Sequence, residues 1–168
     1  KALIAAGKAA FTQGHAEKYG VADQKPKVDY AAAKDHVADV IATIAPHDSV
    51  ERFEGLGVHV ITEFGRFISP TEVQAGEHVI TARRIVIATG SSPFVPPIPG
   101  LDTVPYETNE TIFDLREQPK HLIIIGGGPI GMEMAQAHRR LGSEDTDIEG
   151  QKVFGKDDPE LVALLVER

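Results

Sequence analysis

Residues 121–149, HLIIIGGGPIGMEMAQAHRRLGSEDTDIE, decide the fold of this chain. Four apolar residues, Leu122–Ile125, run directly into the sequence GGGPIG at positions 126–131, and a helical pattern follows. The apolar positions of that pattern, Ile130, Met134, Ala137 and Leu141, share one helical face. The stretch therefore predicts a strand, a glycine turn, a helix and a second strand that ends near Glu149.

Each glycine of the G-x-G-x-x-G pattern has a physical role in binding a dinucleotide. Gly126 permits the tight turn off the strand, Gly128 lets a pyrophosphate approach the backbone, and Gly131 lets the helix pack closely on the strand. The first helical residues, Pro129 and Ile130, stand where free N–H groups and the helix dipole favour phosphate. We therefore expect the pyrophosphate of a dinucleotide at this turn.

The acidic residue Glu149 follows the glycine turn at about the distance, roughly 20 residues, at which a carboxylate binds the adenosine ribose. This position favours NAD over NADP. An ordinary βαβ crossover with a glycine-rich turn is the alternative, because the glycine pattern alone occurs in many loops. We favour nucleotide binding because the strand, the helix and the terminal acid are all present.

Composition limits the class of protein. A chain of 168 residues holds one domain or parts of two, and 42% hydrophobic with 25% charged residues suits a soluble protein with a core. The net charge of −8 and the lack of a basic stripe argue against nucleic acid, and no apolar run is long enough to cross a membrane. The lack of cysteine excludes disulfides and thiolate metal sites within the chain and fits a cytoplasmic origin. The seven histidines show no spacing typical of a metal site.

Helical patterns precede the glycine turn. Residues from Ala2 to Tyr19 predict a helix ended by Gly20, and residues from Asp29 to Ile44 predict a second helix with Asp29 as a possible N-cap. The period then changes to short strand-like runs at 58–61, 66–69, 78–81 and 85–87. We therefore expect two helices and a small β-meander before the nucleotide turn.

A proline-rich connection separates the two halves. Five prolines between Ser91 and Pro105 exclude a helix or a central strand there. We place a domain boundary near Gln118, which gives domains at 1–118 and 119–168. The chain begins without Met and ends within a helical pattern, so we expect it to be a fragment.

A second informative stretch is RRIVIATG at positions 83–90. It predicts a buried strand that ends at Ala88, Thr89 and Gly90, where small residues let the backbone come close to a ligand. An ordinary strand-to-turn transition is the alternative when the motif is taken alone. Its place shortly before the glycine turn favours a second cofactor site.

With these motifs the chain resembles the FAD-dependent pyridine nucleotide–disulfide oxidoreductases, which include dihydrolipoamide dehydrogenase, mercuric reductase and glutathione reductase. The resemblance covers nearly the whole chain and rests on VHVITEFGRF at 58–67, IVIATGSSPFVPPIPGLD at 85–102 and IIIGGGPIGMEMA at 123–135. It implies an α/β fold of the FAD/NAD(P)-binding Rossmann-like class, with a three-layer ββα architecture. Residues 1–118 would be a partial FAD domain with a small β-meander, and residues 119–168 the first half of an NAD domain.

The resemblance also implies site residues. Those matching the family's FAD contacts are Phe64, Gly65, Ala88, Thr89 and Gly90, and those matching its NAD contacts are Gly126, Gly128, Pro129, Ile130, Gly131 and Glu149. Lys1 matches a lysine beside the flavin, and Glu133 matches the glutamate that pairs with it. A buried lysine needs such a counter-charge. The alternatives are a frayed terminus for Lys1 and a surface carboxylate favoured by the helix dipole for Glu133.

The family resemblance implies a parent enzyme, a homodimer that passes electrons between NAD(H), FAD and a redox-active disulfide, with a small molecule or a disulfide as substrate. A dihydrolipoamide dehydrogenase-like activity is favoured. A mercuric reductase, a disulfide-independent NADH oxidase or dehydrogenase, and a non-catalytic nucleotide-binding fragment are the alternatives. This chain lacks the N-terminal flavin fingerprint and the cysteine pair, so we expect it to be inactive alone.

Two carboxylates conflict with the predicted fold. Asp145 and Asp147 fall in the second strand of the nucleotide-binding unit, which should be buried and apolar. Burying a carboxylate is costly unless it is paired or reaches solvent. We expect either a distorted strand or an exposed one.

Overall fold

The computed structural model describes residues 1–167, which form two compact units. The first unit joins residues 1–41 to the residues from 99 onward, and the second comprises residues 42–98. Neither division falls at the predicted domain boundary near Gln118. Compactness and evolutionary domain limits are different properties, so that boundary stays a prediction.

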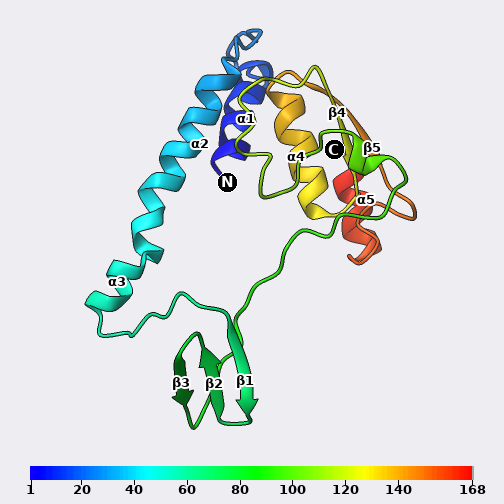
Figure 1. Ribbon diagram of the computed structural model, residues 1–168. Helices are drawn as coiled ribbons and strands as arrows, with labels where there is room; N and C mark the ends of the chain where they lie inside the picture. Colours follow the sequence, from blue (N-terminus) through cyan, green and yellow to red (C-terminus); the bar gives the residue numbers. More distant parts are fainter. Residues whose placement is uncertain (168) are drawn as a thin grey trace. The chain divides into compact units, whose positions relative to one another are not determined.

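Two helices begin the first unit (Figure 1). Helix α1 spans Ala2–Gln13, and helix α2 spans Tyr30–Ile44. The first is shorter than predicted because the chain leaves the helix at Gly14 and makes a separate 3-10 turn, Glu17–Tyr19. Gly20 ends that turn in the left-handed region, with φ of 77°, where glycine is favoured.

The predicted N-cap of α2 is confirmed. The Asp29 carboxylate accepts a hydrogen bond of 3.0 Å from the backbone N–H of Ala32, one of the donors that a helix leaves unpaired at its start. Replacing Asp29 with alanine should therefore lower the free energy of unfolding by about 1 kcal/mol in urea denaturation. Asp29→Asn keeps a capping oxygen and should stay near wild type, and an equal loss in both variants would contradict the cap.

The core of the first unit lies where α1 and α2 meet α4, which spans Pro129–Arg140. Its buried members are Leu3, Tyr30, Val37, Ala137 and Leu141. Gly7 permits the approach of α1 to α4, since a Cβ at Gly7 would lie 3.2 Å from the carbonyl oxygen of Ala137.

The predicted β-α-β unit is confirmed. Strand β4 (His121–Ile125) leads through the glycine turn into α4, and strand β5 (Glu144–Ile148) returns parallel to β4. The register places Leu122 beside Asp145 and Ile124 beside Asp147. Helix α5 (Pro159–Val166) follows. Strand β5 is regular, so the two carboxylates do not distort it.

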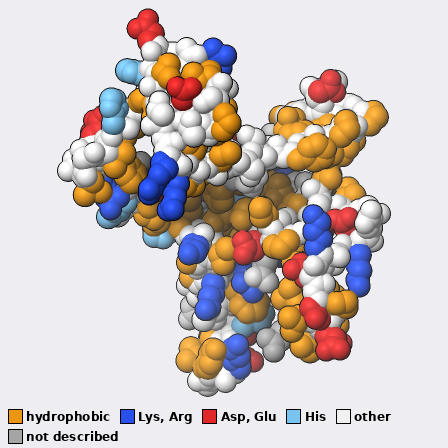
Figure 2. All heavy atoms as spheres, turned by 90° about the horizontal axis from the view of Figure 1, so that it is seen from below, with side chains coloured by type: hydrophobic (Ala, Val, Ile, Leu, Met, Phe, Trp, Pro, Cys, Tyr) orange, Lys and Arg blue, Asp and Glu red, His pale blue; other side chains and the backbone are white. Residues whose placement is uncertain are grey.

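One face of this parallel pair lies against α4, because a Cβ at Gly131 would lie 3.3 Å from Ile124 Cγ2. Three isoleucines on the other face are exposed, with Ile123, Ile125 and Ile148 each at least half accessible. Exposed hydrophobic side chains are also widespread on the molecular face drawn in Figure 2. Many apolar residues of the chain therefore lie on the surface and not in the described core.

The second unit contains the β-meander. Strands β1 (Gly65–Ser69), β2 (Glu72–Ala75) and β3 (His78–Thr81) form an antiparallel sheet in that order, preceded by the short helix α3 (Val50–Gly55). The runs at 66–69 and 78–81 were predicted as strands, whereas β2 and α3 were not. The prediction of strands at 58–61 and 85–87 was wrong.

Residues 85–87 are of types that favour a strand, but they do not form one in the structure. Val86 is 87% exposed and Ile87 is 71% exposed, so the prediction of a buried strand before Ala88 is also wrong. A strand requires hydrogen bonds from a neighbour, and the only sheet described in the second unit is the β1-β2-β3 meander. Residue type alone therefore could not decide this segment.

Candidate functional site

The backbone of the glycine turn requires glycine at position 126 and places Gly128 at the start of α4. Gly126 has φ of 121°, a conformation open to glycine but strained for other residues. Its N–H donates to the carbonyl of Ile148 at 2.9 Å, which ties the turn to the end of β5. Gly128 is the N-cap of α4 in an extended conformation, and Pro129 occupies the first turn. Proline suits that position because its missing N–H would be unpaired there anyway.

The glycines at 128 and 131 meet different surroundings. A Cβ at Gly131 would lie 2.1 Å from the carbonyl oxygen of Gly126, a distance that no side chain can occupy. A Cβ at Gly128 would meet no atom within 4 Å. Gly131 is thus required by the fold itself, whereas the space beside Gly128 is open at the start of a helix. An open backbone cradle at a helix N-terminus suits a phosphate group.

The structure brings Glu149 to this turn. One carboxylate oxygen of Glu149 accepts a hydrogen bond of 2.8 Å from the N–H of Gly127, and the other accepts one of 2.9 Å from the N–H of Gln151. The hydrogen bond from Gly127, and then that from Gln151, lowers the pKa of Glu149. The carboxylate is therefore ionised at neutral pH and lies beside the glycine turn.

The sequence did not predict that residues after Glu149 contact the glycine turn. The N–H of Phe154 donates to the carbonyl of Gly127 at 2.8 Å, so both polar backbone groups of Gly127 are bonded to the segment from 149 to 154. Phe154 has φ of 51°, unusual for a residue with a side chain. No sequence signal marks this contact, because it depends on how the chain returns after β5.

Lys1 precedes α1 and Glu133 lies on α4, and these two helices pack together. Lys1 is the exposed residue that precedes α1, and Glu133 is exposed on α4. Within residues 1–167 the two ion pairs join Arg116 to Asp35 and Arg139 to Asp145, and neither includes Lys1 or Glu133. The pairing of Lys1 with Glu133 beside a flavin stays a prediction.

The residues expected to contact FAD lie in the second unit. Phe64 is fully exposed and precedes β1, whose first residue is Gly65. Ala88, Thr89 and Gly90 are in irregular structure, and Gly90 has φ of 67°. Their flavin contacts stay predictions as well.

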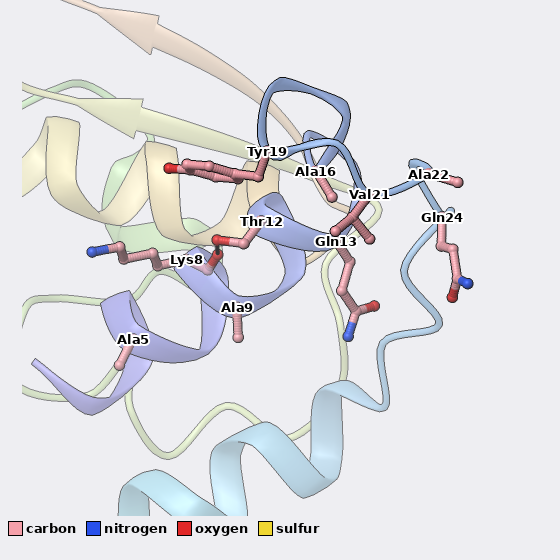
Figure 3. A pocket seen from close by; sticks show the side chains of 10 residues that line it. All are labelled: Ala5, Lys8, Ala9, Thr12, Gln13, Ala16, Tyr19, Val21, Ala22 and Gln24. Carbon is pink, nitrogen blue, oxygen red and sulfur yellow. Dashed lines mark hydrogen bonds between the residues drawn. The ribbon is translucent and has the colours of Figure 1, made fainter.

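A pocket of about 740 Å³ lies elsewhere in the first unit (Figure 3). Its wall includes small residues of α1, such as Ala5 and Ala9, polar residues of the same helix, such as Lys8, and Tyr19 and Val21 from the segment that follows. None of the residues predicted for cofactor binding lines this pocket. Its mainly apolar lining offers no chemistry related to the glycine turn.

The chain matches one protein family over almost its full length. The family described as pyridine nucleotide-disulphide oxidoreductase matches residues 3–167. A mercuric reductase from Bacillus cereus is 32% identical over 162 residues, which is 96% of this chain and 26% of that protein. A chloroplastic dihydrolipoyl dehydrogenase from Arabidopsis thaliana is 33% identical over 151 residues, which is 89% of this chain and 26% of that protein.

Solved structures of flavoprotein disulfide reductases and related proteins share the fold of this chain. An HOCl-induced flavoprotein disulfide reductase from Escherichia coli superposes with a TM-score of 0.67 at 26% identity and covers 94% of this chain and 35% of its own. LpdA from Mycobacterium tuberculosis, at 24% identity, superposes with a TM-score of 0.76 over 99% of this chain and 38% of its own. The predicted fold class is confirmed. The chain spans roughly a quarter to two fifths of the length of these proteins.

Within residues 1–167, no helix combines the length and the apolar character needed to cross a bilayer.

Proposed function

The chain belongs to the pyridine nucleotide-disulphide oxidoreductase family, and from this premise we propose that it supplies the adenosine half of an NAD site and the middle of an FAD site in a larger flavoprotein oxidoreductase. That parent would pass electrons between NAD(H), FAD and a redox-active disulfide, with a small molecule or a disulfide as substrate. We expect the parent to be a cytoplasmic homodimer. A fragment without the disulfide would be inactive alone.

The observation that supports this proposal most is the pairing of an open glycine turn with an ionised carboxylate. Gly128 leaves space at the start of α4, and Glu149 lies beside the same turn. A dinucleotide needs both features, since its pyrophosphate is an anion and its ribose hydroxyls are donors to a carboxylate. When bound, the two cofactors would supply hydride and electron transfer. The chain's own residues would hold the nucleotide through Gly126, Gly128, Gly131 and Glu149.

The first test separates binding from folding. Gly128→Ala adds a methyl group where no atom lies within 4 Å, and its extended backbone is accessible to alanine. The variant should unfold at the wild-type urea concentration but bind NAD at least about tenfold more weakly, because the pyrophosphate can no longer approach the backbone. Calorimetric titration of the purified protein with NAD measures this, and wild-type affinity in the variant would overturn the proposal.

The second test addresses the choice of nucleotide. Glu149→Gln removes the negative charge while keeping the side-chain length, and it should weaken NAD binding by about tenfold. Binding of NADP, whose ribose phosphate is repelled by a carboxylate, should weaken less or improve. Titration with both nucleotides gives the ratio, and a wild-type protein that prefers NADP would contradict the role of Glu149.

We favour a dihydrolipoamide dehydrogenase-like parent, and a mercuric reductase-like parent is the closest alternative because relatives of both kinds are about equally identical to the chain. A disulfide-independent NADH oxidase or dehydrogenase would share both nucleotide motifs. NADH oxidation by the full-length protein with lipoamide, mercuric ion or oxygen as the acceptor distinguishes these three activities. Purified parent without flavin absorbance would contradict all of them and support a non-catalytic fragment.

A further inference from the structure

A cluster of polar side chains is buried in the core of the first unit. Lys34 is 2% exposed, Tyr30 is 5% exposed and His138 is completely buried. Tyr30 and Lys34 come from α2, and His138 comes from α4. Polar groups are costly to bury unless they are hydrogen-bonded. This cluster is not part of the proposed nucleotide site.

The hydrogen bonds of His138 determine its protonation state. Nδ1 lies 2.8 Å from the carbonyl oxygen of Met134, and a carbonyl only accepts, so Nδ1 carries a proton and donates it. In the neutral ring Nε2 is then the acceptor, and the Tyr30 hydroxyl donates to it at 3.1 Å. Burial raises the pKa of Tyr30 to about 12, so its hydroxyl keeps the proton that it donates. The neutral ring satisfies both of its nitrogens.

Lys34 makes a positive charge on His138 less favourable. Its Nζ donates to the carbonyl of Ile112 at 2.6 Å and lies 5.4 Å from the centre of the Tyr30 ring. Burial lowers the pKa of His138, and the nearby charge of Lys34 lowers it further, while the bond to Met134 opposes both effects.

Among residues 1–167, the groups that face this cluster offer His138 no direct counter-charge. Burial lowers the pKa of Lys34, and the charges of Asp114 and Glu107 oppose this effect in part. Helix α1 contributes Leu3, an uncharged side chain, to the adjoining core. A proton on His138 would therefore be buried near a cation, with a carbonyl and a hydroxyl as its hydrogen-bonding partners.

We propose that the contact between Tyr30 and His138 is an acid-sensitive latch that holds α2 against α4 while the ring is neutral and releases it when Nε2 takes a proton from solvent. A protonated Nε2 becomes a donor, so the Tyr30 hydroxyl would have to turn from donor to acceptor, and the contact between the two helices would then enclose a buried imidazolium near the Lys34 cation. Helix α4 begins at the glycine turn, and the latch therefore connects solution pH to the helix that carries this turn.

The direction of the pH effect follows from proton binding. The pKa of His138 is lower in the folded state than the value of about 6.5 expected in an unfolded chain. Above about pH 6.5 neither state binds the proton and the latch stabilises the fold. As the pH falls below that value the unfolded state binds more protons, so stability declines until the folded pKa is reached. The folding constant should fall by up to about tenfold per pH unit within this window.

The test compares the purified protein with two histidine variants between pH 5 and pH 8. Urea denaturation should show wild-type stability falling below about pH 6.5. His138→Gln keeps an amide donor and acceptor but does not titrate, so this decline should shrink by most of its size. The matched control is His36→Gln on the exposed surface of α2, which should keep the wild-type decline. A decline that survives in His138→Gln would overturn the proposal.

Hydrogen exchange on the wild-type protein gives a readout that needs no variant. After correction for the intrinsic dependence of exchange on pH, amides at 30–41 and in α4 should lose protection at pH 5.5 relative to pH 7.5. Amides of the β1-β2-β3 sheet in the second unit provide the internal control and should change little. Equal loss of protection in all three regions would indicate general acid unfolding and contradict a latch.

Discussion

Replacing Gly131 with alanine is expected to lower the free energy of unfolding of the first unit by about 3 kcal/mol, at the upper end of the cost of overpacking a core. The added Cβ would lie 2.1 Å from the carbonyl oxygen of Gly126 and 3.3 Å from Ile124 Cγ2. The clashing atom is backbone, so the clash cannot be relieved by rotating a side chain. Helix α4 would have to move away from β4, or the turn at Gly126 would have to open.

Urea denaturation of wild type, Gly131→Ala and Gly128→Ala measures this effect. The two variants add the same methyl group three residues apart, and a Cβ at Gly128 meets no atom within 4 Å. Only Gly131→Ala should unfold at a lower urea concentration. Nucleotide binding should weaken in both, in the first because the turn is deformed and in the second because the approach to the backbone is blocked. Equal stability of the two variants would refute the close packing of α4 on β4.

Replacing both Asp145 and Asp147 with valine is expected to raise the free energy of unfolding by about 2 kcal/mol. The side chain of Asp145 is 20% exposed, and its Oδ1 is buried without a hydrogen bond, 3.7 Å from Arg139 Nη1. Partial burial, and then the charge of Asp145, raises the pKa of Asp147, but Asp147 is exposed to solvent, so most of the expected gain comes from Asp145. Valine would remove both effects and suits a strand beside Leu122 and Ile124.

The gain should depend on pH with a known sign. A carboxyl whose pKa is raised by folding favours the folded state while it is protonated, and this advantage is lost as the pH rises through the folded pKa. The contribution of Asp147 to the gain should therefore be larger at pH 7 than at pH 3. Denaturation of the double variant at both pH values measures it. Glu144→Val alters the exposed face of the same strand and should change stability by less than about 0.5 kcal/mol, so an equal gain there would point to strand propensity alone.

Local patterns predicted the β-α-β unit well. The apolar run at 122–125, the glycine spacing and the helical period of α4 each act over a few residues, and together they determine a strand, a turn and a helix. The N-cap at Asp29 was predictable for the same reason. The run at 85–87 was not, because its apolar residues suit a strand but a strand forms only where a distant segment supplies hydrogen bonds.

The sequence by itself determined the family and the glycine turn, because those depend on residue identity and spacing within short segments. Only the tertiary structure decided that Glu149 binds the N–H of Gly127, that Asp145 is partly buried beside Arg139, and that His138 reaches Tyr30. Each of these contacts joins residues brought together by packing. Their distances depend on how helices and strands pack against one another, which a pattern within a short segment cannot predict.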